Sequence, residues 1–151
     1  MASRESPAGP CFAGTLAPVQ LIPPQYRFGR IWLLLGWGMV VSVFVLSLIP
    51  IEVDLGKGAD KAEHFIAYAG LAFWFGMLYV RRSQQIAFVA GFIVLGVVVE
   101  FLQGMTDYRD FEVADMVADA IGAFIGFALL QTPAKHVLRW TEQLLVSVLP
   151  K

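Results

Sequence analysis

Long apolar runs alternate with short polar segments along the chain. Four of these runs predict helices, at about residues 31–50, 63–80, 86–105 and 113–131. The first contains twenty residues without a charged side chain. At about 1.5 Å per residue, such a helix covers the roughly 30 Å hydrocarbon core of a bilayer. No run alternates with the period of two that a membrane barrel strand has. The pattern therefore predicts an all-α polytopic membrane protein with four transmembrane helices.

The two ends of the chain differ from these runs. Residues 1–30 contain five prolines, which block a regular helix, and no apolar stretch ahead of a small-residue cleavage site. They are predicted to form a disordered cytoplasmic tail. Residues 135–149 predict an amphipathic cytoplasmic helix that lies on the membrane surface, with a plain helical tail as the alternative. Its stripe is Val137, Thr141, Leu144, Leu145 and Val148.

Composition supports the membrane assignment and excludes several other classes. Hydrophobic residues make up 58% of the 151 positions and charged residues 15%, against about 45–50% and 25% in soluble domains. A soluble bundle of four buried helices would need polar faces, which at least three of the runs lack. The net charge of -1 excludes a strongly basic nucleic-acid-binding protein. A single cysteine excludes an intramolecular disulfide and a multi-cysteine zinc module.

The basic residues predict how the helices are oriented. Short segments rich in Lys and Arg lie on the cytoplasmic side of a membrane. Most of the bases lie before the first run, between the second and third, and after the fourth: Arg4, Arg27, Arg30, Arg81, Arg82, Lys135, Arg139 and Lys151. Both termini are therefore predicted to be cytoplasmic, with residues 51–62 and 106–112 on the outer side.

Polar residues recur at the predicted outer ends of three helices. Their spacings of three and four put the side chains of each set on one helical face. The sets are Asp60, His64 and Tyr68; Glu100 and Gln103; and Asp115 and Asp119. Lys61 and Arg109 flank them. Within a span, each charged residue costs about 2.5–3.5 kcal/mol, so these side chains are expected to face inward and to pair.

We therefore hypothesise that this cluster is a functional site. Within it, Glu100 is predicted to be linked to Arg109 directly or through His64. Asp60 and Asp115 have a simpler alternative role as caps of helix N-termini. A neighbouring stripe of small residues predicts close helix packing instead of chemistry. It consists of Ala118, Gly122 and Gly126.

The order of these residues resembles the VanZ-like family of bacterial membrane proteins. The matching motifs are Asp60-Lys61-x2-His64-x3-Tyr68, Glu100-x2-Gln103 and Arg109-x5-Asp115-x3-Asp119-x2-Gly122. The resemblance covers about residues 57–130 and departs at Asp119, where the family usually has Asn. The family's namesake is an accessory factor in glycopeptide (teicoplanin) resistance. The resemblance thus implies a multi-pass protein of the bacterial cytoplasmic (inner) membrane with a role in the cell envelope, and it implies no reaction.

The sequence leaves three functions open. It also leaves open whether the chain is an enzyme. The first is an envelope accessory factor that binds a lipid-linked or polar head group, with Lys61 and Arg109 contacting phosphate. The second is a metal-dependent hydrolase or transferase with His64, Glu100 and Asp119 as ligands, although HExxH and GxSxG patterns are absent. The third is a proton or cation transporter. No cofactor is predicted. The expected partners are membrane lipids, a lipid-linked envelope precursor and a second copy of the chain, and not nucleic acid.

Overall fold

The computed structural model describes Pro23 and residues 25–50, 59–109 and 111–148. All regular structure in these residues is helical, as the sequence predicts. The elements are α1 (Gly29–Leu48), α2 (Ala59–Leu78), α3 (Arg82–Gln103), α4 (Val113–Leu129), the short 3-10 helix η1 (Pro133–His136) and α5 (Val137–Val148). The four apolar runs correspond to α1–α4, and α2 begins four residues before its predicted start.

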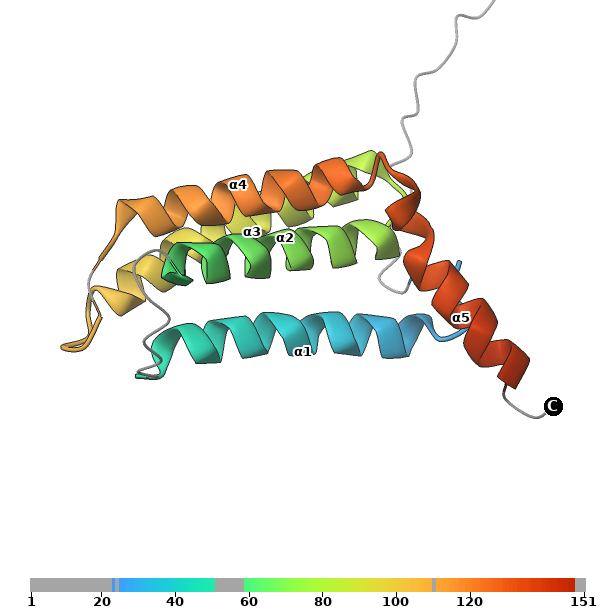
Figure 1. The fold of residues 1–151 in the computed structure, drawn as a ribbon, viewed down its shortest axis with the longest axis horizontal. Helices are drawn as coiled ribbons and strands as arrows, with labels where there is room; N and C mark the ends of the chain where they lie inside the picture. Colours follow the sequence, from blue (N-terminus) through green and yellow to red (C-terminus); the bar gives the residue numbers. More distant parts are fainter. Residues whose placement is uncertain (1–22, 24, 51–58, 110, 149–151) are drawn as a thin grey trace, which may run out of the picture.

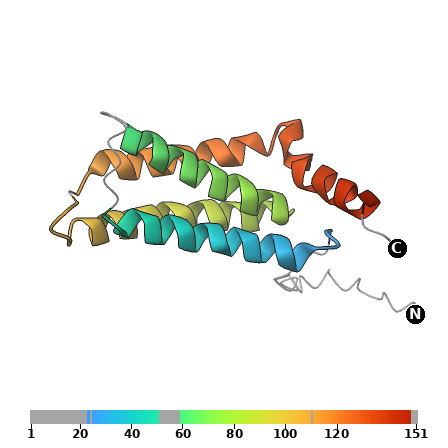
Figure 2. The ribbon, with the colours of Figure 1, turned by 60° about the horizontal axis from the view of Figure 1, so that its bottom comes forward.

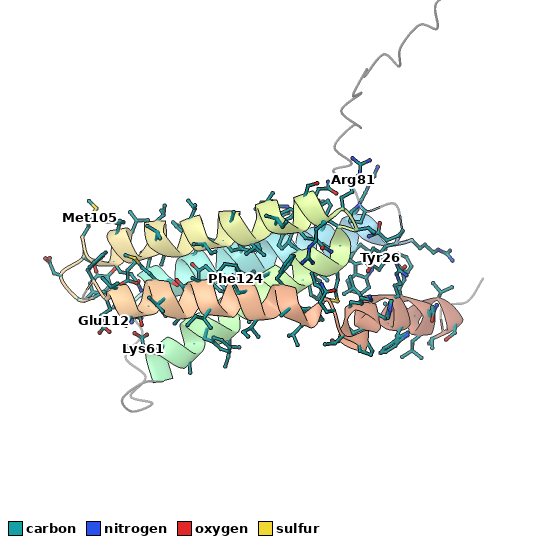
Figure 3. The ribbon with its side chains drawn as sticks, turned by 90° about the horizontal axis from the view of Figure 1, so that it is seen from above. Tyr26, Lys61, Arg81, Met105, Glu112 and Phe124 are labelled. Carbon is teal, nitrogen blue, oxygen red and sulfur yellow. The ribbon has the colours of Figure 1, made fainter. Side chains whose placement is uncertain are left out.

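Helices α1–α4 lie side by side along the long axis, and α5 turns away at one end (Figures 1 and 2). Helix α2 packs against α1, α3 and α4 and so lies at the centre. Consecutive helices run in opposite directions, which gives the bundle two chemically different ends (Figure 3). We call the end that contains Asp60, Glu100, Glu112, Asp115 and Asp119 the acidic end. The end next to α5, which contains Arg27, Arg30, Arg81, Arg82, Lys135 and Arg139, is the basic end.

Small residues bring α4 close to α2. A Cβ on Gly122 would collide with the backbone carbonyl of Phe65, and one on Gly126 with that of Ala69. Ala118 precedes both glycines on the same stripe of α4 and is half-buried. Larger side chains here would push the two helices apart, which is how small-residue stripes act in membrane helices.

An aromatic core fills the bundle away from the acidic end. The side chain of Phe75 is fully buried in α2. It stacks on Phe88 with ring centroids 4.7 Å apart and meets Trp37 edge-on at 5.4 Å. Such pairs contribute about 0.5–1.5 kcal/mol beyond the burial of their area. Apolar packing therefore joins α1, α2 and α3 in this half, while the polar residues gather in the other.

Two helices among the described residues are long and apolar enough to cross a membrane by themselves. These are α1 and α3, each with a mean hydropathy of 2.3. Helix α4 meets the same test only together with η1 and α5, and this pair is bent by 76°. Helix α2 begins with charged residues, among them Asp60 and Lys61, and α4 has 17 residues. The chain is thus a helical membrane protein. Four spans and cytoplasmic termini stay predictions.

The predicted C-terminal helix is present as η1 followed by α5. The Thr132 side chain accepts a hydrogen bond from the Ala134 N–H at 3.3 Å and caps η1. Within α5, Leu138 is buried, whereas Leu144 and Val148 are 66% and 74% exposed. The predicted apolar stripe therefore faces away from the bundle. Its position on a membrane surface stays a prediction, and residue 149 lies outside the described residues.

The boundary of the predicted N-terminal tail needs a correction. Residues 1–22 and 24 lie outside the described residues, but residues 25–30 pack on the bundle. Tyr26 is buried and donates a hydrogen bond from its hydroxyl to the Met77 carbonyl at 3.0 Å, and Gln25 donates to the Leu78 carbonyl. The last carbonyls of a helix lack partners within it. This segment supplies donors to the end of α2, and α1 then begins at Gly29.

Candidate functional site

A buried histidine and a buried carboxylate form the centre of the acidic end. His64 of α2 places Nδ1 3.0 Å from Oδ1 of Asp119 of α4, and the side chains are 8% and 1% exposed. Asp119 also lies against Gly96 of α3, where a Cβ would collide with its carboxylate. Three helices therefore meet at this residue. Because Nδ1 faces Asp119, Nε2 is the ring nitrogen left for a ligand.

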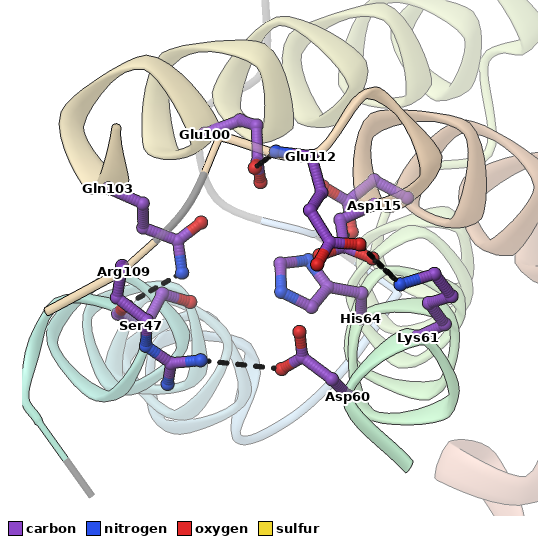
Figure 4. A network of polar contacts seen from close by, with 10 residues as sticks. Ser47, Asp60, Lys61, His64, Glu100, Gln103, Arg109, Glu112 and Asp115 are labelled. Carbon is purple, nitrogen blue, oxygen red and sulfur yellow. Dashed lines mark hydrogen bonds and ion pairs between the residues drawn. The ribbon is translucent and has the colours of Figure 1, made fainter. Parts of the chain in front are cut away.

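A lysine and a glutamate link the helices around this centre (Figure 4). Lys61 Nζ lies 2.6 Å from Glu112 Oε2 and 3.4 Å from Asp115 Oδ1. The backbone N–H of Glu112 donates to Oε1 of Glu100. Glu112 directly precedes α4, so this one residue connects the start of α4 to both α2 and α3.

The predicted direct link between Glu100 and Arg109 is absent from the described residues, and a link through His64 stays a prediction. Arg109 Nη1 instead lies 3.5 Å from Asp60 Oδ1. The reason is the path of the connection between α3 and α4, which brings the Glu112 N–H to Glu100 and carries the guanidinium toward α2. Gln103 turns toward α1 and donates to the carbonyl of Ser47 at 2.9 Å.

Several buried polar atoms of this region have no hydrogen-bond partner within the described part of the chain. They are Tyr68 Oη, Glu100 Oε2, Asp115 Oδ1 and Asp119 Oδ2. For Asp115 Oδ1 the 3.4 Å approach of Lys61 is an ion pair without a hydrogen bond. An unsatisfied buried polar group costs about 1–3 kcal/mol. The acidic end therefore has acceptors and one hydroxyl that a ligand or a cation would satisfy.

A cavity of about 160 Å³ opens between α1, α2 and the end of α3, and of these four side chains only Tyr68 lines it. Its polar lining comprises Ser47, Asp60, Glu63, His64, Tyr68, Gln103 and Arg109. Pockets for drug-sized ligands measure about 300–1,000 Å³. This cavity accommodates a small polar group and not a whole lipid.

One group of ligand atoms in the described residues has the proximity that a metal site requires. Asp60, His64 and Asp115 each offer an atom within 4.8 Å of the others. The sequence-based trio of His64, Glu100 and Asp119 is therefore not the one that the fold assembles. Asp119 lies behind His64, in the position from which a carboxylate orients a metal-binding imidazole.

Comparison with known proteins gives one result. The model of the VanZ/LLP1 family matches residues 7–134. The chain belongs to the VanZ/LLP1 family. This confirms the resemblance drawn from the three motifs and extends it toward both ends of the chain. No curated protein and no solved structure matches the chain.

In this VanZ/LLP1 protein all nine predicted site residues lie at the acidic end, in two groups. Those that line the cavity are Asp60, His64, Tyr68, Gln103 and Arg109. Those that do not line it are Lys61, Glu100, Asp115 and Asp119, which contact His64, Glu112 or one another. The topology predicted from the apolar runs accounts for this gathering, because it places the start of α2, the end of α3 and the start of α4 together.

Sequence reasoning missed Glu63, Glu112 and Gly96. Glu63 lines the cavity, Glu112 bridges two helices, and Gly96 provides the space for the Asp119 carboxylate. The sequence does contain a signal for Glu112 and Gly96. Glu112 immediately precedes a predicted helix, and Gly96 lies four residues before Glu100, on the same helical face.

Proposed function

We propose that this VanZ/LLP1 protein is a cell-envelope accessory factor that binds the hydroxyl-rich head group of a lipid-linked envelope precursor at its acidic end. One observation carries the proposal. A small cavity is lined by the buried phenol of Tyr68, whose hydroxyl has no hydrogen-bond partner among the described residues, and by the carboxylates of Asp60 and Glu63. Sugar hydroxyls both donate and accept, so one such group in the cavity satisfies the hydroxyl of Tyr68 and donates to the carboxylates of Asp60 and Glu63 without adding charge.

The charges around the cavity assign a role to Arg109. Lys61 is held by Glu112 at 2.6 Å and Asp115 at 3.4 Å. Arg109 is less constrained, since its one ion pair in the described residues, with Asp60, is 3.5 Å long. Its planar fork suits a phosphate that joins the sugar to the lipid. Arg109 is therefore the phosphate-binding residue of this proposal, and Lys61 orders the carboxylates.

The proposed leaflet follows from the distribution of bases. Lys and Arg gather at the basic end, so the acidic end faces outward under the positive-inside rule. Lipid-linked precursors of the envelope present their head groups on that side after export. A contribution to glycopeptide resistance is the part of the proposal that comes from the family's namesake.

The test uses the full-length protein in detergent and native mass spectrometry with two probes. One is a short-chain polyprenyl diphosphate that carries a disaccharide, and the other is the same lipid without the sugar. Tyr68→Phe removes only a hydroxyl that lacks a partner in the described residues. It is expected to keep the melting temperature and to weaken binding of the sugar-bearing probe about two- to tenfold, the worth of one hydrogen bond.

Asp107→Asn is the matched control, because Asp107 lies at the same end and does not line the cavity. It should leave binding unchanged. Equal binding of the two probes, or equal effects of Tyr68→Phe and Asp107→Asn, would contradict a sugar-binding role.

The second candidate is a metal-dependent hydrolase or transferase, favoured by the proximity of Asp60, His64 and Asp115. A divalent cation held there would polarise a phosphoryl oxygen of a bound substrate. Chelator-treated protein titrated with Mg²⁺, Mn²⁺ or Zn²⁺ separates the candidates. A rise in melting temperature that Asp115→Asn abolishes and Asp107→Asn preserves supports the enzyme. No rise with any of the three metals supports head-group binding alone.

A further inference from the structure

A second and larger cavity lies at the opposite, basic end of the bundle. It measures about 410 Å³ and opens between the end of α2, the start of α3, the end of α4 and the η1–α5 segment. Its basic lining residues are Arg82, Lys135, His136 and Arg139. None of the lining residues, all from the described ranges, is an Asp or a Glu. The lining therefore has the composition of an anion-binding site.

The two guanidinium groups are held by their surroundings. Arg82 lies over the ring of Phe127, with 3.9 Å between its Cζ and the ring centroid. This contact uses the flat face of the guanidinium and leaves the N–H groups in its plane for an anion. Arg139 of α5 approaches the hydroxyl of Tyr26, which is itself fixed by its hydrogen bond to Met77. Burial raises the pKa of Tyr26, so this hydroxyl stays a neutral donor.

The acid on α5 has partners other than these cations. Glu142 is buried, and its Oε1 accepts from the backbone N–H of Phe28 at 2.7 Å and from Trp32 Nε1 at 3.2 Å. These bonds connect α5 to the start of α1. Glu142 therefore joins two elements and does not line the cavity.

The carbonyls at the end of α2 also have donors other than the cations. Gln85 Nε2 donates to the carbonyls of Gly76 and Tyr79, both at 2.9 Å. Those of Met77 and Leu78 accept from Tyr26 and Gln25. The four basic residues are thus not required to satisfy the end of this helix, and their charge is available to a ligand.

The cavity adjoins apolar surface of the kind that enters a bilayer. On α5, Val137, Trp140 and Leu144 are 42%, 55% and 66% exposed. Tryptophan is enriched at membrane–water interfaces, and an amphipathic helix lies there with its apolar side in the lipid. An α5 that lies on the membrane surface, as predicted, would put the basic cavity at the depth of lipid head groups, where basic pockets between helices bind acidic lipids.

We propose that the cavity at the basic end binds the phosphate of an anionic phospholipid in the leaflet next to α5. Arg82 and Arg139 donate charge-assisted hydrogen bonds to the phosphate oxygens, and Lys135 adds a point charge. The acyl chains lie along the exposed apolar side chains of α5. This proposal is independent of the acidic end and holds for either orientation of the protein.

The experiment measures lipid binding to the full-length protein by native mass spectrometry. The probes are short-chain phosphatidylglycerol, short-chain phosphatidylcholine and inorganic phosphate. The wild type is expected to prefer phosphatidylglycerol, with no competition from inorganic phosphate at millimolar concentration. Arg82→Gln and Arg139→Gln should each weaken phosphatidylglycerol binding about tenfold, the worth of one charge-assisted hydrogen bond, and leave phosphatidylcholine binding unchanged.

Arg30→Gln is the matched control, since Arg30 lies at the same end on α1 and does not line the cavity. The ratio of the two lipids within one sample reports selectivity even for a less stable variant. Lys135→Gln, an exposed position of η1, tests the same ratio if an arginine variant does not fold.

Three outcomes would overturn the proposal. An equal loss in Arg30→Gln would mean a general attraction of the basic end to acidic membranes. Full competition by inorganic phosphate would mean a site for a free anion. A lower melting temperature in the arginine variants with an unchanged lipid ratio would mean that the cations only stabilise helix ends.

Discussion

The carboxylates at the acidic end of the bundle are buried, whereas the arginines that line the cavity at the basic end are exposed. At the acidic end, Glu100, Asp115 and Asp119 are 1–4% exposed, and each has one oxygen that accepts no hydrogen bond from the described residues. At the basic end, Arg82 and Arg139 are exposed around an open cavity. A buried charge depends on fixed partners, whereas an exposed one is solvated. The stability of the acidic end is therefore expected to depend on single polar atoms. The exposed arginines of the basic end are suited to a ligand that exchanges.

The largest effect is expected where a buried pair is broken at the acidic end. Asp119→Ala leaves Nδ1 of His64 without its partner and should lower the free energy of unfolding by about 3–5 kcal/mol. Asp119→Asn keeps an oxygen acceptor and should cost much less. Denaturant unfolding in detergent measures both. Similar losses in the two variants would show that the pair is not what stabilises this end.

The corresponding change at the basic end tests its own buried acid. Glu142→Ala removes the acceptor of the Phe28 N–H and of the Trp32 indole and should cost about 1.5–3 kcal/mol. Because these bonds hold α5, the loss should appear as faster hydrogen exchange in residues 137–148, with α2 unchanged. Glu142→Gln, which retains an acceptor, is the control. Unchanged exchange in Glu142→Ala would mean that other contacts hold α5.

A smaller effect is expected from crowding the carboxylate instead of removing it. In Gly96→Ala the new Cβ meets Asp119 and forces it away from His64. Overpacking costs about 1–3 kcal/mol, and the better helix propensity of Ala returns up to about 1 kcal/mol. Gly91→Ala on the same helix meets nothing within 4 Å and should be neutral or stabilising. Thermal unfolding of the two variants compares them, and equal melting temperatures would refute the crowding.

The smallest effect is expected at the exposed margin of the acidic end. The side chains of Lys61 and Glu112 are 43% and 47% exposed, so their ion pair is screened by salt. Lys61→Gln should lower the melting temperature slightly in dilute buffer, and the difference should vanish in about 1 M NaCl. The loss in Asp119→Ala should persist in the same salt. A salt-independent effect of Lys61→Gln would place this lysine with the buried group.

The sequence predicted the fold class and which residues lie together in the site. It did not predict which of these residues pair with one another. The apolar runs predicted α1–α4 within a few residues, and the spacing of Asp60, His64 and Tyr68 predicted one polar face. The direct pairing of Glu100 with Arg109 was predicted wrongly. Its partner is a backbone N–H at the end of the loop between α3 and α4, and the spacing of side chains along a helix carries no information about such a loop.

The sequence by itself determined which residues share a helix face and which helix ends meet. The helical repeat is a constant of the backbone, and short connections force neighbouring helices to be antiparallel. Only the tertiary structure decided which atoms pair. The His64–Asp119 contact depends on how closely Gly122 and Gly126 let α4 approach α2 and on the space that Gly96 leaves in α3. A hydrogen bond tolerates only a few tenths of an ångström, and that accuracy arises from packing between helices and not from periodicity along one of them.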